Sequence, residues 1–311
     1  MPDSLNPSEQ APVDMADVTV VMPAKNGAQT IARALASIRA QSVRPKKVVI
    51  VDDGSSDGTA DAARDAADDL DVHVIVNDTS RGSGPSRNLA IEVATTRWIA
   101  FLDCDDEWLP GHLEQALDVA QGHVLVTAPA LDSQGHPRGN VSGKPLRLTP
   151  ARCFVPDNPV MTSCTLADRA AVERAGMFRP LRRAQDLDLW ARLLEQGPGV
   201  ALARVGAVYH LRPAAPDRTS NDIDRSCVLK VLADNADKAW MTARVRDGCL
   251  GRMEWDDLRL AQREARWSDL VRHGLWFAAH PTAAPGVISM FANRRQARRV
   301  RATLALFTAS A

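Results

Sequence analysis

The sequence has no excess of charge of either sign, because its 38 lysines and arginines match its 38 aspartates and glutamates. Nucleic-acid binders usually carry a basic excess, so this balance argues against a nucleic-acid partner. The sequence also lacks closely spaced pairs of cysteines. The five cysteines are odd in number, scattered and never in a CxxC spacing: Cys104, Cys153, Cys164, Cys227 and Cys249. We therefore expect neither a disulfide framework nor a zinc site, and a reducing compartment suits the chain.

Long hydrophobic runs are also lacking. No stretch approaches the roughly 18 consecutive apolar residues that are needed to cross a bilayer. The first sixteen residues have neither the basic n-region nor the apolar h-region of a secretory signal peptide. These absences predict a soluble, cytoplasmic protein, or one that is at most peripheral at the inner face of the membrane.

What the sequence does contain is a regular alternation of short apolar runs and longer helical patterns. The expected strands cover 18–22, 48–51, 72–76, 98–102 and 205–210. The expected helices begin near Thr30, Thr59 and Pro85, cover 166–175, and begin again near Asp186. Unbroken apolar strands that alternate with helices predict an α/β fold whose mostly parallel sheet is covered by helices on both faces.

The pattern changes twice along the chain. Residues 132–150 are rich in glycine, proline and serine, which predicts a mobile loop. Beyond residue 221 the strand signals stop and only helical periodicity remains. The expected organisation is therefore a disordered tail over 1–16, an α/β domain over 17–220 and a helical C-terminal extension over 221–311.

Three of the expected strands end in clusters of polar and charged residues. These clusters are Pro23–Asn26, Asp52–Asp57 and Asp103–Asp106. In open parallel sheets the ligand crevice lies beyond the carboxyl ends of the strands. The coincidence of the three segments predicts a polar, acidic ligand site along one rim of the sheet.

The most acidic of these segments holds Asp103, Asp105 and Asp106 within four residues. Three adjacent carboxylates repel one another unless a cation lies among them. A hard divalent ion with oxygen ligands, Mg²⁺ or Mn²⁺, meets that need. The alternative is a solvated acidic turn that caps the helix after it.

Four motifs, taken together and in order, resemble those of the family 2 glycosyltransferases. They are VTVVMPAKNGAQT at 18–30, VVIVDDGSSDGT at 48–59, GPSRNLAI at 84–91 and WIAFLDCDDEW at 98–108. The resemblance covers about residues 18–212 and implies the GT-A fold, which is Rossmann-like, and a nucleotide-diphosphate sugar as donor. Because several motifs agree in order and spacing, the match is more specific than any one of them.

The resemblance also implies roles for the residues of the rim. Those expected to hold the nucleotide are Pro23, Ala24, Lys25, Asn26, Asp52, Asp53, Arg87 and Asp103. Asp53 is expected to bond the base and Asp103 the ribose, while Asp105 binds the metal with help from Asp106. Two alternatives stay open: an Asx turn that closes the second strand, and a surface salt bridge for Arg87.

A further motif, RAQDLDLW at 183–190, resembles the segment that supplies the base in inverting members. Asp186 takes the base position, and Gln185 stands where the family frequently has glutamate. Trp190, four residues on, is either an acceptor platform or a core residue. His210 is expected to complete the metal or diphosphate site, the alternative being a structural histidine.

The resulting expectation is an inverting, metal-dependent glycosyltransferase that uses Mn²⁺ or Mg²⁺. Its donor would be a UDP-, dTDP- or GDP-linked sugar, and its acceptor a glycan, a lipid-linked glycan or a small molecule. Two alternatives remain, a catalytically silent nucleotide-sugar-binding scaffold and a nucleotidyltransferase. The latter would need a glycine-rich loop after the first strand, which MPAKNG does not provide.

The end of the chain carries a basic segment that contains Arg294, Arg295, Arg298, Arg299 and Arg301. A helix there would present a solvated basic face, or it would rest on an anionic membrane surface.

Overall fold

The structure is a computed structural model that describes residues 15–155, 158–210, 225–263, 265, 267–280 and 283. The basic segment around residue 298 lies outside these residues, as does the tail expected over 1–16 except for its last two residues, which begin the first strand. The chain divides into two compact units. The first comprises 1–147, 160–180 and 196–213, and the second comprises 148–159, 181–195 and 214–311. The second unit thus includes two segments that lie within the α/β domain expected over 17–220.

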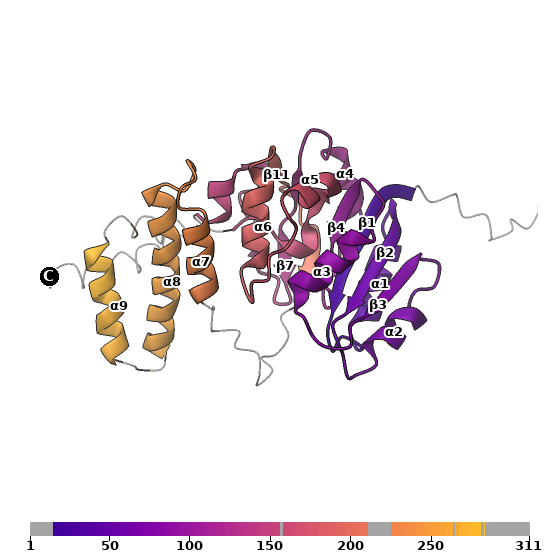
Figure 1. Cartoon of the computed structure of the whole chain (residues 1–311), viewed down its shortest axis with the longest axis horizontal. Helices are drawn as coiled ribbons and strands as arrows, with labels where there is room; N and C mark the ends of the chain where they lie inside the picture. The colour runs from indigo at the N-terminus through magenta and orange to yellow at the C-terminus, as the bar shows by residue number, and fades with distance from the viewer. Residues whose placement is uncertain are drawn as a thin grey trace, which may run out of the picture. The chain divides into compact units, whose positions relative to one another are not determined.

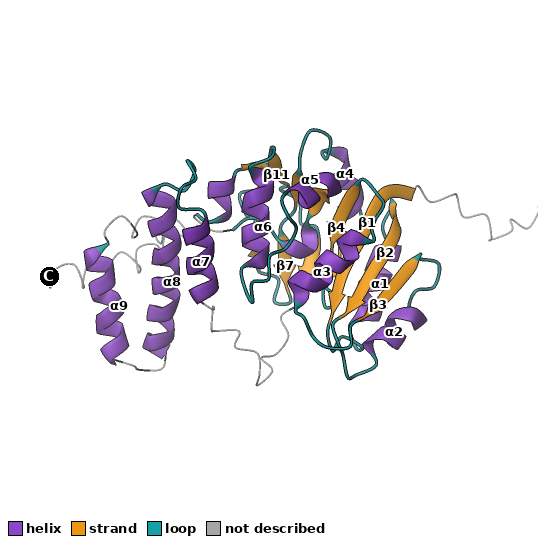
Figure 2. Cartoon of the chain, in the orientation of Figure 1, coloured by secondary structure: helices purple, strands orange, loops and turns teal. Residues whose placement is uncertain are grey.

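The first unit is built on an eight-stranded sheet (Figures 1 and 2). In spatial order its strands are β3 (Val72–Val76), β2 (Arg44–Asp52), β1 (Met15–Ala24), β4 (Trp98–Phe101), β10 (Leu166–Asp168), β6 (Leu125–Thr127), β11 (Gly199–Ala201) and β9 (Leu146–Leu148). The β3-β2-β1-β4 half is parallel, whereas β10 runs antiparallel to both β4 and β6. The expected mostly parallel sheet is therefore confirmed.

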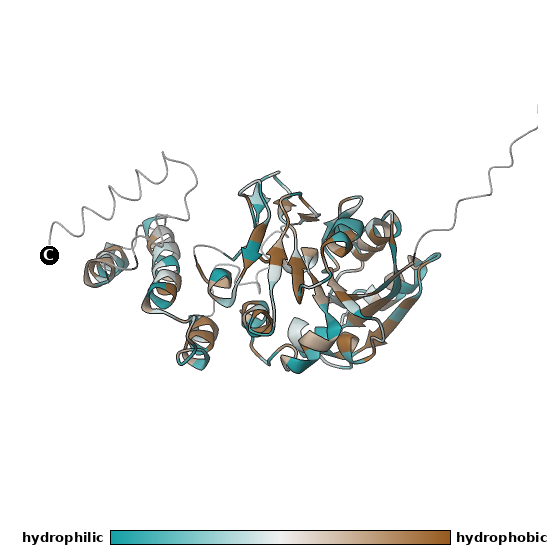
Figure 3. Cartoon of the chain, turned by 90° about the horizontal axis from the view of Figure 1, so that it is seen from above, coloured by the Kyte–Doolittle hydropathy of each residue, from teal (hydrophilic) through white to brown (hydrophobic). Residues whose placement is uncertain are grey.

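The strands are apolar because both of their faces are covered (Figure 3). Val20 and Met22 of β1 belong to one core cluster with Leu35 and Ile38, which lie on α1 (Ile31–Arg39). Val21 points to the opposite face of the sheet, yet it is equally inaccessible to solvent. Alternate residues of a strand face opposite sides, so a strand that is buried throughout needs a layer on each side.

The other helical segments of the first unit connect these strands. They are α2 (Thr59–Asp65), α3 (Ser83–Glu92), α4 (His112–Asp118), η2 (Thr162–Cys164) and α5 (Arg169–Arg174). The expected helix over 166–175 was wrong in its first turn, because Leu166–Asp168 pairs with β4 and β6 as strand β10. The helix starts only after Asp168, whose carboxylate accepts a hydrogen bond from the backbone of Ala171 and so caps α5.

A second, four-stranded sheet lies in the same unit, in the order β5 (Glu107–Trp108), β12 (Ala207–Tyr209), β7 (Ala130–Asp132) and β8 (Pro137–Arg138). β8, the last residue of β7, and β9 of the larger sheet fall in the segment 132–150, for which the sequence predicted a loop. Polar side chains order this segment: Asp132 accepts from the backbone of Gln134 and His136, and Asn140 donates to the carbonyls of Lys144 and Ala201.

The second unit is helical in the part of it that the structure describes. Its elements are η1 (Pro150–Cys153), α6 (Gln185–Leu194), α7 (Arg225–Asp234), α8 (Ala243–Arg263) and α9 (Trp267–Ala279). Phe154 stacks on Trp240, and the indole N–H of Trp240 donates to Glu195 at 2.7 Å. These contacts join the segment after η1, the end of α6 and the chain between α7 and α8. None of the helices described is long and apolar enough to cross a membrane.

Candidate functional site

The three polar segments meet at one rim of the larger sheet. The strands β2, β1 and β4 are adjacent and parallel, so their carboxyl ends lie on the same edge. The backbone N–H of Asp53 donates to Ala24 O at 2.8 Å, and that of Leu102 donates to Val21 O at 3.2 Å. The sheet order therefore brings together segments that are far apart in the sequence, as the strand pattern predicted.

The segment after β1 combines buried and exposed positions. Pro23 and Ala24 are buried within the strand, while Lys25 and Asn26 are exposed. Asn26 has a positive φ of 48° and exchanges hydrogen bonds with the loop after β2, donating its N–H to Ser55 and accepting from the backbone of Ser56. Of the residues expected to line a base and ribose, Lys25 and Asn26 are thus the ones that face solvent.

Asp53 is the most heavily bonded carboxylate of the rim. It accepts from the side chains of Asn77, Ser80 and Ser86 and from the backbone of Arg81 and Gly82. Burial raises its pKa, but these hydrogen bonds outweigh burial and hold the pKa below its usual value.

The two oxygens of a carboxylate offer about four lone-pair sites. The hydrogen bonds that Asp53 already accepts fill these sites. A hydrogen bond from a nucleotide base to Asp53 would therefore have to replace one of the bonds that hold the loop before α3. Its neighbour Asp52 accepts from the backbone of Ser55 at 3.0 Å, a local bond similar to the Asx turn that the sequence left open, although it spans three residues instead of two.

The acidic segment after β4 turns its side chains alternately outward and inward. Asp103 and Asp105 are partly exposed, whereas Cys104 and Asp106 are buried. Arg87 donates to Asp103 at 2.6 Å, and its own side chain is only 6% exposed. Arg87 therefore forms an ion pair with Asp103 in which the arginine is buried and the aspartate is partly exposed, so the pair is not the exposed surface salt bridge that the sequence left open.

Asp106, which is expected to help bind the metal, differs from its two acidic neighbours in being turned inward. It is fully buried, and each of its oxygens accepts a hydrogen bond, one from the Ser163 hydroxyl and one from the His210 backbone N–H at 2.9 Å. Burial, and then the charges of Asp103 and Asp105, raise its pKa to about 7. The alternation of the segment directs this side chain inward, whereas Asp103 and Asp105 stay partly exposed.

His210 lies next to the acidic segment, because β12 pairs with β5 and the backbone N–H of His210 donates to Asp106. Its ring lies against Glu107, with 2.8 Å between Nε2 and Oε1. The imidazole therefore bonds a residue that the sequence reasoning overlooked, although Glu107 directly follows the acidic run. Ser163 was missed as well, and no local pattern in the sequence singles it out.

These carboxylates fit a divalent cation. Asp103 and Asp105 offer the oxygen ligands that Mg²⁺ and Mn²⁺ prefer. Arg87 is the cation that pairs with Asp103, and the charges of both aspartates still raise the pKa of the buried Asp106. The segment therefore carries negative charge that a cation at the rim would offset.

The expected base and acceptor residues lie on α6, in the second unit. Asp186 occupies the first turn of the helix, and its charge, after burial, raises the pKa of the Cys153 thiol. Trp190 is fully buried, which agrees with the core alternative that the sequence left open for it. Asp188 is buried too and pairs with Arg192 one turn on, with 2.6 Å between Oδ2 and Nη2.

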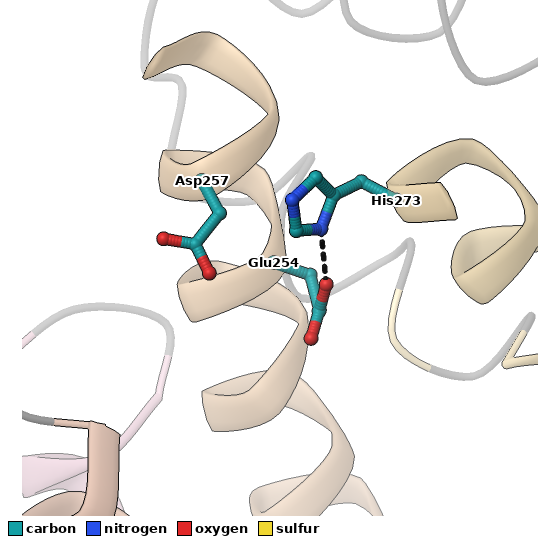
Figure 4. A group of neighbouring side chains, drawn as sticks. All are labelled: Glu254, Asp257 and His273. Carbon is teal, nitrogen blue, oxygen red and sulfur yellow. Dashed lines mark hydrogen bonds and ion pairs between the residues drawn. The ribbon is translucent and has the colours of Figure 1, made fainter. Parts of the chain in front are cut away.

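A second group of polar side chains lines a cavity of about 630 Å³ along α8 and α9. Glu254 and Asp257 come from α8 and His273 from α9 (Figure 4), and their ligand atoms lie close enough to share a metal ion. His273 bonds Glu254 at 2.6 Å. However, the guanidinium of Arg225 pairs with both carboxylates, so a cation already occupies the position between them. The cluster is an ion-pair network that joins α7, α8 and α9.

Comparison with known sequences identifies the family. The family described as "Glycosyl transferase family 2" matches residues 19–182. The succinoglycan biosynthesis protein ExoU of Rhizobium meliloti is 33% identical over 207 residues, which is 58% of this chain and 58% of ExoU. ExoO of the same organism, also a succinoglycan biosynthesis protein, is 31% identical over 269 residues, or 80% of this chain and 75% of ExoO.

Solved structures agree on the fold. S. aureus TarS (residues 1–349, in complex with UDP-GlcNAc) superposes with a TM-score of 0.65 at 17% identity, covering 94% of this chain and 89% of TarS. The Pyrobaculum calidifontis mannosyltransferase PcManGT, in complex with GDP-Man and Mn²⁺, gives a TM-score of 0.61 at 19% identity, covering 98% and 90% of the two chains.

These matches confirm the GT-A fold and set the nucleotidyltransferase alternative aside. The rim of polar strand ends, the ordered motifs and the extent of the family match lead to one assignment: the chain is a glycosyltransferase and belongs to family 2.

Proposed function

We propose that this glycosyltransferase moves a sugar from a nucleotide-diphosphate donor to an acceptor hydroxyl with inversion and with the help of a divalent cation. The observation that carries the proposal is the acidic segment after β4, which presents Asp103 and Asp105 at the rim and turns Asp106 inward. Two carboxylates directed toward the ligand edge suit a diphosphate that arrives together with a metal.

In the proposed reaction, the acceptor oxygen forms a bond to the anomeric carbon as the bond from that carbon to the diphosphate breaks. Asp186 takes the hydroxyl proton, and the nucleoside diphosphate leaves with the electron pair of the broken bond. The residues Asp103 and Asp105 would hold the cation, which supplies positive charge beside the departing diphosphate. Arg87 keeps Asp103 in place, and the loop that is organised by Asp53 forms the edge against which the nucleoside lies.

The relatives favour a role in polysaccharide assembly. ExoU and ExoO are both described as succinoglycan biosynthesis proteins. We therefore propose that the acceptor is a growing cell-surface glycan, free or lipid-linked, and that the chain acts in the cytoplasm or at the inner face of the membrane. The solved neighbours bind UDP-GlcNAc and GDP-Man, which makes UDP- and GDP-sugars the first donors to examine.

The test is thermal unfolding of the full chain with UDP, GDP, dTDP and CDP, each with and without Mn²⁺. A ligand that binds only the native state stabilises it by about 2.7 kcal/mol at a hundredfold excess over Kd. We expect one nucleotide to raise the Tm, and to do so only when Mn²⁺ is present. A shift that is equal with and without the metal would contradict the metal dependence, and no shift with any nucleotide or intact nucleotide sugar would support the silent scaffold.

A further inference from the structure

Ser163, which no motif singles out, bonds the acidic segment at two points and the strand β5 after it at a third. Its hydroxyl accepts from the backbone N–H of Asp103 at 3.3 Å and donates to the Asp106 carboxylate. Its carbonyl oxygen accepts from the indole N–H of Trp108 at 2.6 Å. The side chain is buried at 7% exposure, and it comes from η2.

These bonds determine which way the carboxylates face. The backbone N–H of Asp106 donates to Asp103 O at 3.0 Å, which closes a tight turn. Ser163 holds one oxygen of Asp106 inside this turn, and the His210 backbone holds the other. With Asp106 tied inward, Asp103 and Asp105 are left at partly exposed positions on the outer side.

The remaining contacts fix the outer side of the same turn. Arg33 donates to the Asp105 carbonyl at 2.7 Å, and Arg87 pairs with the Asp103 carboxylate. Neither contact acts on Asp106. The hydroxyl of Ser163 is thus the side-chain group that links the inner carboxylate to the backbone of an outer one.

We propose that Ser163 is a positioning residue for the divalent-cation site, and that Asp106 is its buried anchor instead of a ligand. The inference rests on the proposed metal dependence. Groups that orient metal ligands typically change metal affinity by 10- to 100-fold when they are removed. Removing the hydroxyl takes away one of the two bonds that hold the Asp106 carboxylate and the bond to the Asp103 backbone, so the spacing of Asp103 and Asp105 is less firmly fixed.

The two roles for Asp106 give opposite results in Ser163→Ala. If Asp106 is the anchor, the released turn binds Mn²⁺ at least tenfold more weakly. If Asp106 is a ligand, loss of the serine bond frees one of its oxygens, and Mn²⁺ binds as well as before or more tightly. Ser163→Thr keeps the hydroxyl and should restore the wild-type affinity. Ser163→Cys keeps a side chain of similar size but replaces the hydroxyl with a thiol, which is a weaker donor. Its Kd for Mn²⁺ should lie between those of Ser163→Ala and Ser163→Thr.

The experiment measures the Kd for Mn²⁺ from the EPR signal of the free ion, on the full chain, with saturating UDP or GDP, whichever stabilises the wild type. The matched control is Thr19→Val, which removes a buried hydroxyl bonded to Thr96 at 2.7 Å, away from the rim. We expect Thr19→Val to lower the Tm and to leave the Kd for Mn²⁺ unchanged. Ser163→Ala should weaken Mn²⁺ binding at least tenfold even if its Tm falls no further than that of Thr19→Val.

The outcomes separate this inference from the proposed function. If the wild type binds no Mn²⁺ in the presence of any nucleotide, the proposed metal dependence fails and the inference fails with it. If the wild type binds and Ser163→Ala binds equally well, only the inference is overturned. Parallel losses in Ser163→Ala and Thr19→Val would show a general structural effect and would also overturn it.

Discussion

The guanidinium of Arg87 donates to Asp103 at 2.6 Å and at the same time lies over the ring of Phe178, 5.4 Å from the ring centroid. One side chain thus connects α3 to the acidic segment after β4 and to the chain beyond α5. In this pair the arginine side chain is nearly buried, whereas the aspartate side chain is partly exposed to solvent. This asymmetry suits an arginine that holds a ligand-facing carboxylate in place.

Replacing Arg87 with methionine should weaken nucleotide binding about tenfold, because Asp103 then loses the donor that orients it. The measurement is the Kd for the nucleotide in the presence of Mn²⁺, by calorimetry. Arg97→Met is a suitable control, since Arg97 lies over Trp98 by a similar contact but pairs with no residue of the rim. An unchanged Kd in Arg87→Met would show that Asp103 keeps its position without the ion pair.

Asp53→Asn should destabilise the first unit by about 3 kcal/mol, because an amide nitrogen cannot accept the hydrogen bonds that a carboxylate oxygen accepts. Asp53 accepts bonds from both backbone and side-chain donors of the loop before α3. Asp52→Asn, at a carboxylate that accepts from Ser55, should cost about 1 kcal/mol. Urea unfolding compares the two variants. Equal losses would contradict the role of Asp53 as the organiser of the loop.

Gly27 allows the segment after β1 to approach the acidic segment. A Cβ at this position would lie 2.8 Å from Sγ of Cys104, which is closer than van der Waals contact permits. Gly27→Ala should therefore push the acidic segment and weaken Mn²⁺-dependent nucleotide binding several-fold. Adding Cys104→Ala removes the sulfur and should restore most of the affinity, with Cys104→Ala alone as the control. No recovery in the double variant would show that the steric explanation is wrong.

Asp186→Asn should lower turnover by 10²- to 10⁴-fold while nucleotide binding stays unchanged, because the amide cannot accept the acceptor proton. Asp188→Asn is the contrasting variant on the same helix. It leaves Arg192 without its buried partner carboxylate and should lower the Tm. Turnover that survives Asp186→Asn would remove this residue from the role of base.

The ion-pair network of the second unit should make stability fall in acid. Burial raises the pKa of Glu254, but the bonds from Arg225 and His273 outweigh it and hold the pKa below the usual 4.5. A carboxylate with a depressed native pKa stabilises the fold above its unfolded pKa, and this contribution is lost as the pH falls through the native value.

Glu254→Gln should therefore cost about 2 kcal/mol at neutral pH. It should also flatten the part of the Tm profile below about pH 4.5, relative to the wild type. The measurement is thermal unfolding between pH 3 and pH 7. Profiles of the same shape in both proteins would show that Glu254 does not cause the acid sensitivity.

The positions of the first four strands and of the polar segments that follow them were predictable, because they depend on local patterns. Val72–Val76 is a strand as expected, and Val18–Met22 lies inside the longer β1. Because the carboxyl ends of neighbouring parallel strands lie at the same edge of the sheet, the polar segments meet there however the side chains pack. The helix expected at 166–175 was partly wrong, because Leu166–Asp168 finds strand partners that a local pattern does not reveal.

The sequence did not predict which of these side chains point toward the rim and which point into the core. Asp103, Asp105 and Asp106 are chemically alike, and only the hydrogen bonds from Ser163 and His210, which are distant in the sequence, hold the last of them inward. Trp190 and Asp186 share one helix, yet the tryptophan is in the core. Composition and periodicity are local and established the α/β class, the rim and the family motifs. Burial and hydrogen-bond partners arise from contacts between distant segments, so they required the folded chain.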